Sequence, residues 1–385
     1  MAGALAPLVE AYQDRAGHAR EAHARGARVV GYLCDNVPVE LIRAAGFIPY
    51  RLSGDTKRSR EEIADLVTPV HARRFAGNEF VEAIYATLAS GELDFLDYLV
   101  VPHNRKAVLA MLQSIELLRA AKPGFRVPEG YCLDRSYARN FLTSGFNQAS
   151  LHRFAAALGK WRGPPITDDE LRQGIAEGAR CRSLLREVNA LRTSEAPRIT
   201  GSEALHVYGA SHFMAPAKFE KAASAFLEEA RARGVLPGLR IYVGGSPLDH
   251  PQFYELVESL GAVVVAEDQC WGARCADLDV AADCAPLDAL ARRFDRQPAC
   301  SLLGSLDAVT DAVVARMTAS GAEAAIFTVT RGDLAQMWET PSQVDALRAR
   351  GIPCLHLGRQ PYNLGDTSKV ADEIAAFLSE VRNNG

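Results

Sequence analysis

Short apolar runs alternate with amphipathic stretches over the first third of the chain. The apolar runs predict buried strands at residues 28–33, 47–52, 96–101 and 130–134. Between the first two, Pro38 suits the first turn of a helix over residues 39–45, and Gly46 suits the left-handed position that ends it. Strands that alternate with helices predict a parallel sheet with helices on both of its faces.

The middle of the chain has a different pattern. Residues 140–235 show the spacing of long helices and few strand signals. A helix start is expected at Thr167, whose hydroxyl can cap the helix while Glu170 reaches back to the Thr167 backbone. From Gly238 onward the alternation resumes, with strands expected at 239–243, 261–266, 325–329 and 353–357 and a last helix at 370–381.

These patterns predict an α/β fold of two open parallel-sheet lobes, Rossmann-like or flavodoxin-like, joined by a helical segment. A chain of 385 residues also exceeds one ordinary core, which favours two lobes. The expected division is an N-terminal helix at 1–26, a first α/β lobe at 27–139, a helical connector at 140–237 and a second α/β lobe at 238–385.

Composition narrows the class of protein. Lys and Arg number 43 against 47 Asp and Glu, so no nucleic-acid partner is expected. No apolar run reaches the roughly 18 residues that span a bilayer, so no membrane partner is expected either. The first 26 residues lack the apolar core and cleavage site of a signal peptide. We therefore expect a cytoplasmic protein.

The cysteines are scattered rather than arranged in a framework. The chain has 8 of them: Cys34, Cys132, Cys181, Cys270, Cys275, Cys284, Cys300 and Cys354. Since no CxxC pair occurs and the chain lacks secretory features, disulfides are not expected. Buried thiols that pack as small hydrophobic groups explain most of these residues. The pair Cys270 and Cys275 is only a weak candidate for a metal clip, so we predict no metal ligands in this chain.

The expected fold also predicts where a site lies. In open parallel sheets, ligands bind in the crevice beyond the carboxyl ends of the strands. The loops at this edge are residues 34–38, 103–106, 244–249, 268–275, 330–333 and 358–362. Two lobes of this kind would face each other across a cleft.

Two of these loops suggest anion binding. Gly244-Gly245-Ser246 either presents backbone donors to a phosphate or forms a tight turn that needs glycine for its dihedral angles. His103 with Lys106, and Arg274 with Arg331, could bind carboxylate or phosphate groups, although such charges are commonly just solvated. No GxSxG elbow or other nucleophile signature occurs, so no catalytic residue is assigned.

Several motifs resemble the 2-hydroxyacyl-CoA dehydratase and benzoyl-CoA reductase family. The opening VVGYLCDNVPVELIRAAGFIPYRLSGD is similar to the first family motif, which reads P-x-E-L-I-x-A-A-G-x-x-P. The segment RIYVGGSPLDHPQFYELVESLGAVVVAEDQCWGAR is similar to the family's Gly-Ser loop, its E-x-x-G-A-x-V-V segment and its Cys-x-Gly-x-Arg. PLDALARRF, AAIFTVTRGD and RARGIPCLHL follow in the family's order, so the resemblance covers nearly the whole chain.

The resemblance implies an oxygen-sensitive heterodimeric enzyme of anaerobic metabolism that acts on a CoA thioester. It is a lyase that removes water from a 2-hydroxyacyl-CoA, or an oxidoreductase that reduces an aromatic acyl-CoA ring. In such enzymes a subunit holds a [4Fe-4S] cluster, and an ATP-hydrolysing activator protein injects one electron. The cluster supplies the redox chemistry, and the protein supplies position and electrostatics.

This sequence departs from the family at the cluster-ligand positions. The three stretches that match the family's cysteine ligands are residues 69–74, 102–106 and 330–333, and none contains cysteine. In the last of them Asp333 is kept, while its neighbour is Gly332. Cys34 and Cys270 match cysteines that are common in relatives, but those are not assigned as ligands. Because cluster ligation requires thiolates, the departure puts a cluster in this chain in doubt.

Two hypotheses remain. In the first, the chain is the non-cluster half of a heterodimer, with the [4Fe-4S] cluster in a paralogous partner subunit. In the second, it is a diverged acyl-CoA-binding protein or a redox-independent acyl-CoA enzyme of the same fold. The first is preferred, because the strand-end motifs are kept. The substrate-binding candidates are Cys34, Asn36, His103, Asn104, Lys106, Gly245, Ser246, Cys270, Arg274 and Arg331.

Overall fold

The first lobe contains a four-stranded parallel sheet. The computed structural model describes residues 3–66, 77–104, 106–121, 126, 128–136, 138, 141–300 and 304–384. The sheet consists of β1 (Val29–Tyr32), β2 (Ile48–Arg51), β3 (Tyr98–Pro102) and β4 (Glu129–Leu133), in the order β2-β1-β3-β4. All its pairings are parallel. The predicted strands of this lobe are confirmed.

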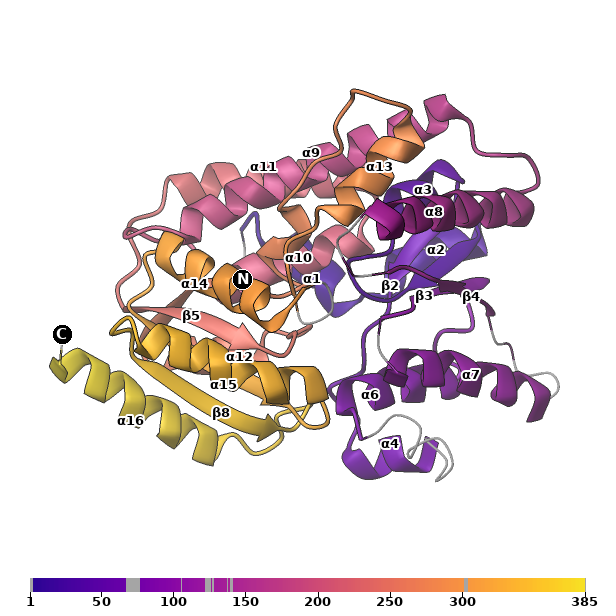
Figure 1. Cartoon of the computed structure of the whole chain (residues 1–385). Coiled ribbons are helices and arrows are strands. Elements are labelled where there is room, and N and C mark those ends of the chain that lie inside the picture. The colour runs from indigo at the N-terminus through magenta and orange to yellow at the C-terminus, as the bar shows by residue number, and fades with distance from the viewer. Residues whose placement is uncertain are drawn as a thin grey trace.

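Helices cover both faces of this sheet (Figure 1). One face carries α3 (Val39–Ala44) and α8 (Phe141–Arg162), and the other carries α6 (Glu79–Ala89) and α7 (Lys106–Ala121). The predicted end of α3 is confirmed, since Gly46 has a φ of 76°. The helices α1 (Ala6–Gln13), α2 (Gly17–Ala24) and α4 (Arg60–Leu66) are also present.

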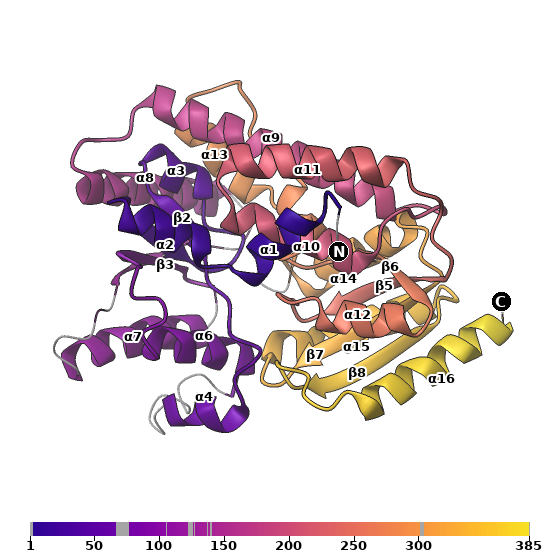
Figure 2. The same cartoon turned by 180° about the vertical axis from the view of Figure 1, so that it is seen from behind.

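The second lobe repeats the same order of strands. Its sheet consists of β5 (Leu239–Gly245), β6 (Ala262–Glu267), β7 (Ala324–Thr330) and β8 (Cys354–Gln360), in the order β6-β5-β7-β8. One face carries α12 (Gln252–Ser259) and α16 (Ser368–Asn384), and the other carries α14 (Leu306–Ala319) and α15 (Leu334–Arg348) (Figures 1 and 2). The chain is therefore an α/β protein with two parallel-sheet lobes, as the sequence predicts.

Long helices link the two lobes. They are α9 (Asp168–Arg192), α10 (Gly201–Phe213) and α11 (Pro216–Arg231), and α13 (Pro286–Asp295) packs against α8 and α9. The predicted start of α9 is confirmed, because Thr167 and Glu170 form a complete capping box. In Figure 1, α9 and α11 run side by side, and α9 extends from β6 of the second lobe to α3 of the first. The exact division at residues 27, 140 and 238 stays a prediction.

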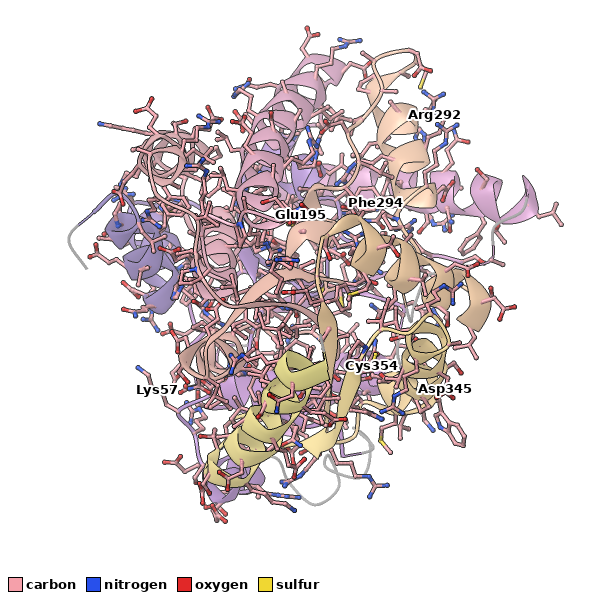
Figure 3. The ribbon with its side chains drawn as sticks, turned by 90° about the vertical axis from the view of Figure 1, so that its left-hand side faces the viewer. Lys57, Glu195, Arg292, Phe294, Asp345 and Cys354 are labelled. Atoms are coloured by element: carbon pink, nitrogen blue, oxygen red, sulfur yellow. The ribbon has the colours of Figure 1, made fainter. Side chains whose placement is uncertain are left out.

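One apolar core is shared between the lobes. A single cluster of buried side chains includes Val29 and Leu99 of the first sheet together with Ile241 and Ile326 of the second. Figure 3 shows the side chains around the ribbon, with Arg292 at the periphery of α13 and Phe294, which belongs to a separate apolar cluster, further inside. Continuous burial of this kind positions the two sheets relative to each other.

The part of the chain that the structure describes contains no membrane-spanning helix. None of the helices found there is long and apolar enough to cross a bilayer.

Candidate functional site

A cavity lies between the two lobes at the carboxyl ends of their strands. It is lined by the segments that follow β1, β5, β6 and β7, by the last residue of β2 and by the first turns of α6 and α7. The cavity has a volume of about 820 Å³ including its opening to solvent. In both sheets the order in which strands are added reverses between the two central strands, and ligands bind at such a switch point in open α/β sheets. We call it the inter-lobe cavity.

The loop after β1 brings a thiol and a carboxylate to this cavity. Cys34 has a φ of 68°, a left-handed conformation that is rare for residues other than glycine. Its sulfur accepts a hydrogen bond from Asn104 Nδ2 at 3.2 Å. The next residue, Asp35, lies 3.4 Å from Arg274 Nε, and Arg274 is also 3.7 Å from Asp268. The Arg274 guanidinium is therefore held between carboxylates from both lobes.

The loop after β5 is a tight turn that glycine makes possible. Gly245 has a φ of 102°, and a Cβ atom there would lie well inside contact distance of the Thr328 carbonyl. Ser246 Oγ donates to Asp333 Oδ2 and accepts from Thr330 N, both at 2.9 Å. The helix α12 begins only at Gln252, so the glycines do not open directly into a helix. This geometry favours the tight-turn interpretation over a phosphate cradle.

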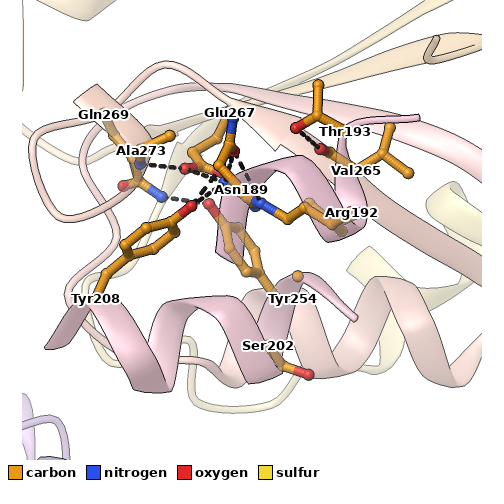
Figure 4. Close-up of polar contacts among 12 residues, drawn as sticks. Asn189, Arg192, Thr193, Ser202, Tyr208, Tyr254, Val265, Glu267, Gln269 and Ala273 are labelled. Carbon is orange, nitrogen blue, oxygen red and sulfur yellow. Dashed lines mark hydrogen bonds and ion pairs between the residues drawn. The ribbon is translucent and has the colours of Figure 1, made fainter. Parts of the chain in front are cut away.

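A buried ion pair holds the loop after β6 (Figure 4). Arg192 of α9 and Glu267 at the end of β6 are both fully buried, and Arg192 Nη2 donates to Glu267 Oε1 at 2.6 Å. The same carboxylate oxygen accepts from Ala273 N at 2.7 Å, which closes residues 268–272 into a loop. Gln269 then bonds to Leu248 N and to the Tyr254 hydroxyl. Cys270 and Trp271 are thus fixed at the cavity wall.

Two glycines allow the lobes to touch at one side of the cavity. Gly332 has a φ of 75°, and a Cβ atom at this position would overlap the Gly77 carbonyl. Nearby, Asn78 Nδ2 donates to Gly332 O at 3.3 Å, and Glu79 N donates to Arg331 O at 3.2 Å. Any side chain at position 332 would therefore separate the loop after β7 from α6.

The structure brings some of the predicted site residues together. Five of them line the inter-lobe cavity: Cys34, Gly245, Ser246, Cys270 and Arg274. Asn104 contacts this group through its bond to Cys34. Asn36 is only 1% exposed and does not line the cavity. That these residues bind a substrate stays a prediction.

The remaining predicted residues lie outside the cavity. His103 Nδ1 is 2.8 Å from Asp134, and both side chains are half-exposed. Lys106 is exposed, and Arg331 lies 3.5 Å from Glu79 rather than beside Arg274. The expected clamps, His103 with Lys106 and Arg274 with Arg331, are therefore not formed as pairs facing the cavity.

The most unusual residue of the cavity wall was not singled out from the sequence. Arg51, the last residue of β2, is 1% exposed, and its guanidinium carbon lies 4.1 Å from the centroid of the Trp271 ring. Its Nη1 donates to Cys270 O at 3.0 Å. A charged residue that ends an apolar run, as in Ile-Pro-Tyr-Arg-Leu, is the sequence signal that would have identified it.

The ligand set for an iron–sulfur cluster is incomplete where the structure describes it. Gly332, where the resemblance to the family leads us to expect a cysteine, has no room for a side chain. Burial raises the pKa of Cys270, which disfavours the thiolate that a cluster needs. Among the residues with described positions, no group of three His, Cys, Asp or Glu side chains could hold a metal ion. The stretch 69–74 lies outside the described residues. Its sequence contains no cysteine.

The chain is thus a two-lobed α/β protein, and its candidate site is the inter-lobe cavity at the carboxyl ends of the strands. The family model described as 2-hydroxyglutaryl-CoA dehydratase, D-component, matches residues 34–380. The chain belongs to this family, and it is a subunit of the 2-hydroxyacyl-CoA dehydratase type, as its motifs predict. It is 22% identical over 375 residues to the (R)-2-hydroxyglutaryl-CoA dehydratase subunit beta of Acidaminococcus fermentans, covering 92% of this chain and 94% of that protein.

Proposed function

We propose that this chain is one half of a heterodimeric enzyme that acts on a CoA thioester, with the acyl end of the substrate in the inter-lobe cavity. The proposal rests on the inter-lobe cavity. Loops from both lobes line this cavity, and the chain belongs to a family of acyl-CoA dehydratases. The relative from Acidaminococcus fermentans is named as a beta subunit of an enzyme acting on an acyl-CoA, which supports a two-subunit enzyme.

The lining suits the acyl part of such a thioester. Apolar side chains, including Leu33, Val81 and Trp271, provide surface for a carbon chain or ring. Arg274 provides a fixed guanidinium close to this surface. A positive group held in place by Asp35 and Asp268 would stabilise negative charge that develops on a thioester carbonyl oxygen. These residues bind and orient the substrate in the proposal, and none is assigned as a proton donor or acceptor.

The partner subunit, in this proposal, carries the [4Fe-4S] cluster, and an ATP-dependent activator protein serves that partner. The cluster would supply one-electron reduction of the substrate, which this chain's own residues do not provide. The lack of space at Gly332 and the absence of cysteine from all three matching stretches support this division of labour. The partner would be a paralogue with its cysteines intact.

Iron content tests this assignment directly. Purified alone and reconstituted without oxygen, the chain should hold no stoichiometric iron. About four iron atoms per chain, with the absorption of a thiolate-bound cluster, would overturn it. Co-expression with a cysteine-complete paralogue should give one stable complex on a sizing column. Two separate monomers together with acyl-CoA binding by this chain would favour the redox-independent alternative.

Matched substitutions test the cavity. Cys270→Ala and Cys354→Ala both remove a thiol that is 8% exposed, but only Cys270 lines the inter-lobe cavity. Ser246→Ala lies in the cavity wall, while Ser320→Ala removes a buried hydroxyl that bonds to Met317 O elsewhere. In the assembled enzyme, Cys270→Ala and Ser246→Ala should change acyl-CoA affinity and turnover, and the two controls should not. Unchanged kinetics in both cavity variants would show that the substrate does not bind in the inter-lobe cavity.

A further inference from the structure

A second cavity lies among β1, α3 and β2 of the first lobe and α9, α10 and α13. We call it the connector cavity; it has a volume of about 640 Å³ including its opening. It shares Asp35 and Arg51 with the inter-lobe cavity, and its other lining residues belong to different segments. Its charged lining residues are Asp35, Glu40, Arg43, Arg51, Arg182 and Arg293.

Both carboxylates of the connector cavity are already engaged by other guanidinium groups. Glu40 Oε1 accepts from Arg182 Nη1 at 2.7 Å and lies 3.7 Å from Arg293 Nη1. Asp35 lies 3.4 Å from Arg274, which lines the inter-lobe cavity. The positive charges of two residues, Arg43 and Arg51, are therefore left without a carboxylate of their own.

Arg51 is a buried cation that forms no ion pair with a described carboxylate, although Asp35 attracts it from a longer distance and helps to raise the pKa of Arg51. It is 1% exposed, and its Nη1 donates to His212 Nε2 at 2.8 Å and to Cys270 O at 3.0 Å. Its Nε and Nη2 make no hydrogen bond to any residue that the structure describes. The side chains outside the described part include no Asp or Glu. Buried N–H groups without acceptors are costly, and an anion beside Arg51 would accept from both nitrogens.

His212 reveals how the donors of this cavity are arranged. Because a guanidinium can only donate, His212 Nε2 is an acceptor, and Nδ1 carries the hydrogen. Nδ1 then donates to the Tyr32 hydroxyl at 3.2 Å. Burial, together with the charges of Arg51 and Arg43, holds the pKa of His212 well below its ordinary value, in agreement with a neutral ring.

Tyr32 therefore adds a third donor to the set. Its oxygen accepts from His212, and its own hydrogen has no acceptor among the described residues. Burial raises the pKa of Tyr32 to about 12, so the hydroxyl keeps this hydrogen. The cavity thus combines an O–H donor with the free N–H groups of Arg51 and with Arg43. A donor set of this kind matches the oxygens of a carboxylate or a phosphate group.

The connector cavity shares two lining residues with a surface recess. Arg43 and His212 also line a surface recess together with His18, Glu177 and Met214. Arg43 is half-buried and lines both this recess and the connector cavity.

We propose that the connector cavity binds a small oxyanion, held by Arg43, Arg51 and the Tyr32 hydroxyl. The bound anion neutralises Arg51. Since Arg51 also stacks on Trp271 and bonds to Cys270 O, the anion stabilises the loop that forms one wall of the inter-lobe cavity. The ligand is either a free oxyanion or a phosphate group of CoA itself.

Calorimetric titration of the full chain with inorganic phosphate tests the proposal, with sodium chloride keeping the ionic strength constant. Arg43→Gln changes a half-buried side chain, and Arg51→Met removes a buried charge whose loss need not unfold the chain. Each should weaken phosphate binding by at least about tenfold, as expected for a lost charge-assisted hydrogen bond. If Arg51→Met fails to fold, Arg43→Gln carries the test.

The control is Arg180→Gln, because Arg180 lies on α9, is exposed, pairs with Glu220 and lines neither cavity. It should bind phosphate like the unchanged chain. Free CoA that displaces phosphate identifies a CoA phosphate group as the ligand, and CoA that does not displace it identifies a free oxyanion. Titration heats from phosphate, sulfate and acetate that equal those from sodium chloride would overturn the proposal. That result would leave the inter-lobe site untouched, because its test uses acyl-CoA and other residues.

Discussion

Single residues decide how closely the lobes approach each other. Gly332 and Gly351 have nearly the same left-handed backbone, with φ angles of 75° and 76°. They differ in their surroundings, since a Cβ at 332 would overlap Gly77 O, whereas a Cβ at 351 would meet nothing within 4 Å. The two positions therefore separate backbone strain from steric exclusion between the lobes.

Gly332→Ala should destabilise the chain by roughly 3 kcal/mol or more, and Gly351→Ala by about 1 kcal/mol. The second value is the cost of a left-handed alanine alone. The first adds the displacement of the Gly77 backbone, which is a form of overpacking. Urea unfolding of both variants measures the difference. Equal losses would mean that the lobes do not meet closely at position 332.

The pair of Arg192 and Glu267 should behave as a buried unit. Arg192→Met or Glu267→Gln alone should cost about 3–5 kcal/mol, because each leaves a buried charge without its partner. The double variant should cost less than the sum of the single ones. A double-mutant cycle by chemical denaturation gives this coupling. Additive losses would show that the two charges do not depend on each other.

The helix α9 lies close to the backbone of a neighbouring helix. A Cβ at Gly174 would lie 2.7 Å from Glu40 O, so the glycine allows α9 to lie against the backbone of α3. Gly145 in α8 has nothing within 4 Å of the same position. One helix thus requires its glycine for packing, and the other does not.

Gly174→Ala should destabilise the chain by about 1–3 kcal/mol, since the overpacking outweighs the better helix propensity of alanine. Gly145→Ala should instead stabilise it by up to about 1 kcal/mol, because only the propensity changes. Thermal unfolding of the two variants compares them. Stabilisation by Gly174→Ala would mean that α3 moves away without cost.

An arginine network joins the first lobe to the helical middle of the chain. Arg182 of α9 donates to Glu40 of α3 and to Asp279, both at 2.7 Å. Burial opposes ionisation of Glu40, but Arg293 and Arg182 more than offset it and hold the pKa of Glu40 below its ordinary value. A carboxylate whose pKa is lower in the folded chain than in the unfolded chain stabilises the folded state fully at pH values above the unfolded-state pKa. This stabilisation is lost as the pH falls from the unfolded-state pKa through the lower folded-state pKa.

Stability should therefore fall as the pH drops below about 4.3, the ordinary pKa of a glutamate. Glu40→Gln should lower stability at pH 7 by about 3–5 kcal/mol and should show a weaker loss toward acid pH. The exposed Asp169→Asn is the control, since its carboxylate only meets Arg172 at the surface. Urea midpoints across the pH range give the result. A Glu40→Gln midpoint equal to that of the unchanged chain at pH 7 would contradict the assignment.

The sheet elements were predictable because their signals are local. Buried parallel strands are continuous apolar runs, and the turns after them need glycine or proline, so the strands and the Thr167 capping box could be placed from the sequence. The loops at the strand ends followed from the parallel topology, and Cys34, Ser246, Cys270 and Arg274 do lie at the inter-lobe cavity. His103, Lys106 and Arg331 do not, because a loop at the correct edge can still point its side chains to solvent.

The sequence by itself determined the two-lobed α/β class, the order of its elements and the family, since these depend on periodicity and on motifs within short stretches. Tertiary structure alone decided which charges face each other. Arg51, Asp35, His212 and Trp271 are up to 236 residues apart, and only the packing of two sheets and α10 brings them together. Whether each N–H group of a buried guanidinium finds an acceptor depends on its whole surroundings, which no local pattern encodes.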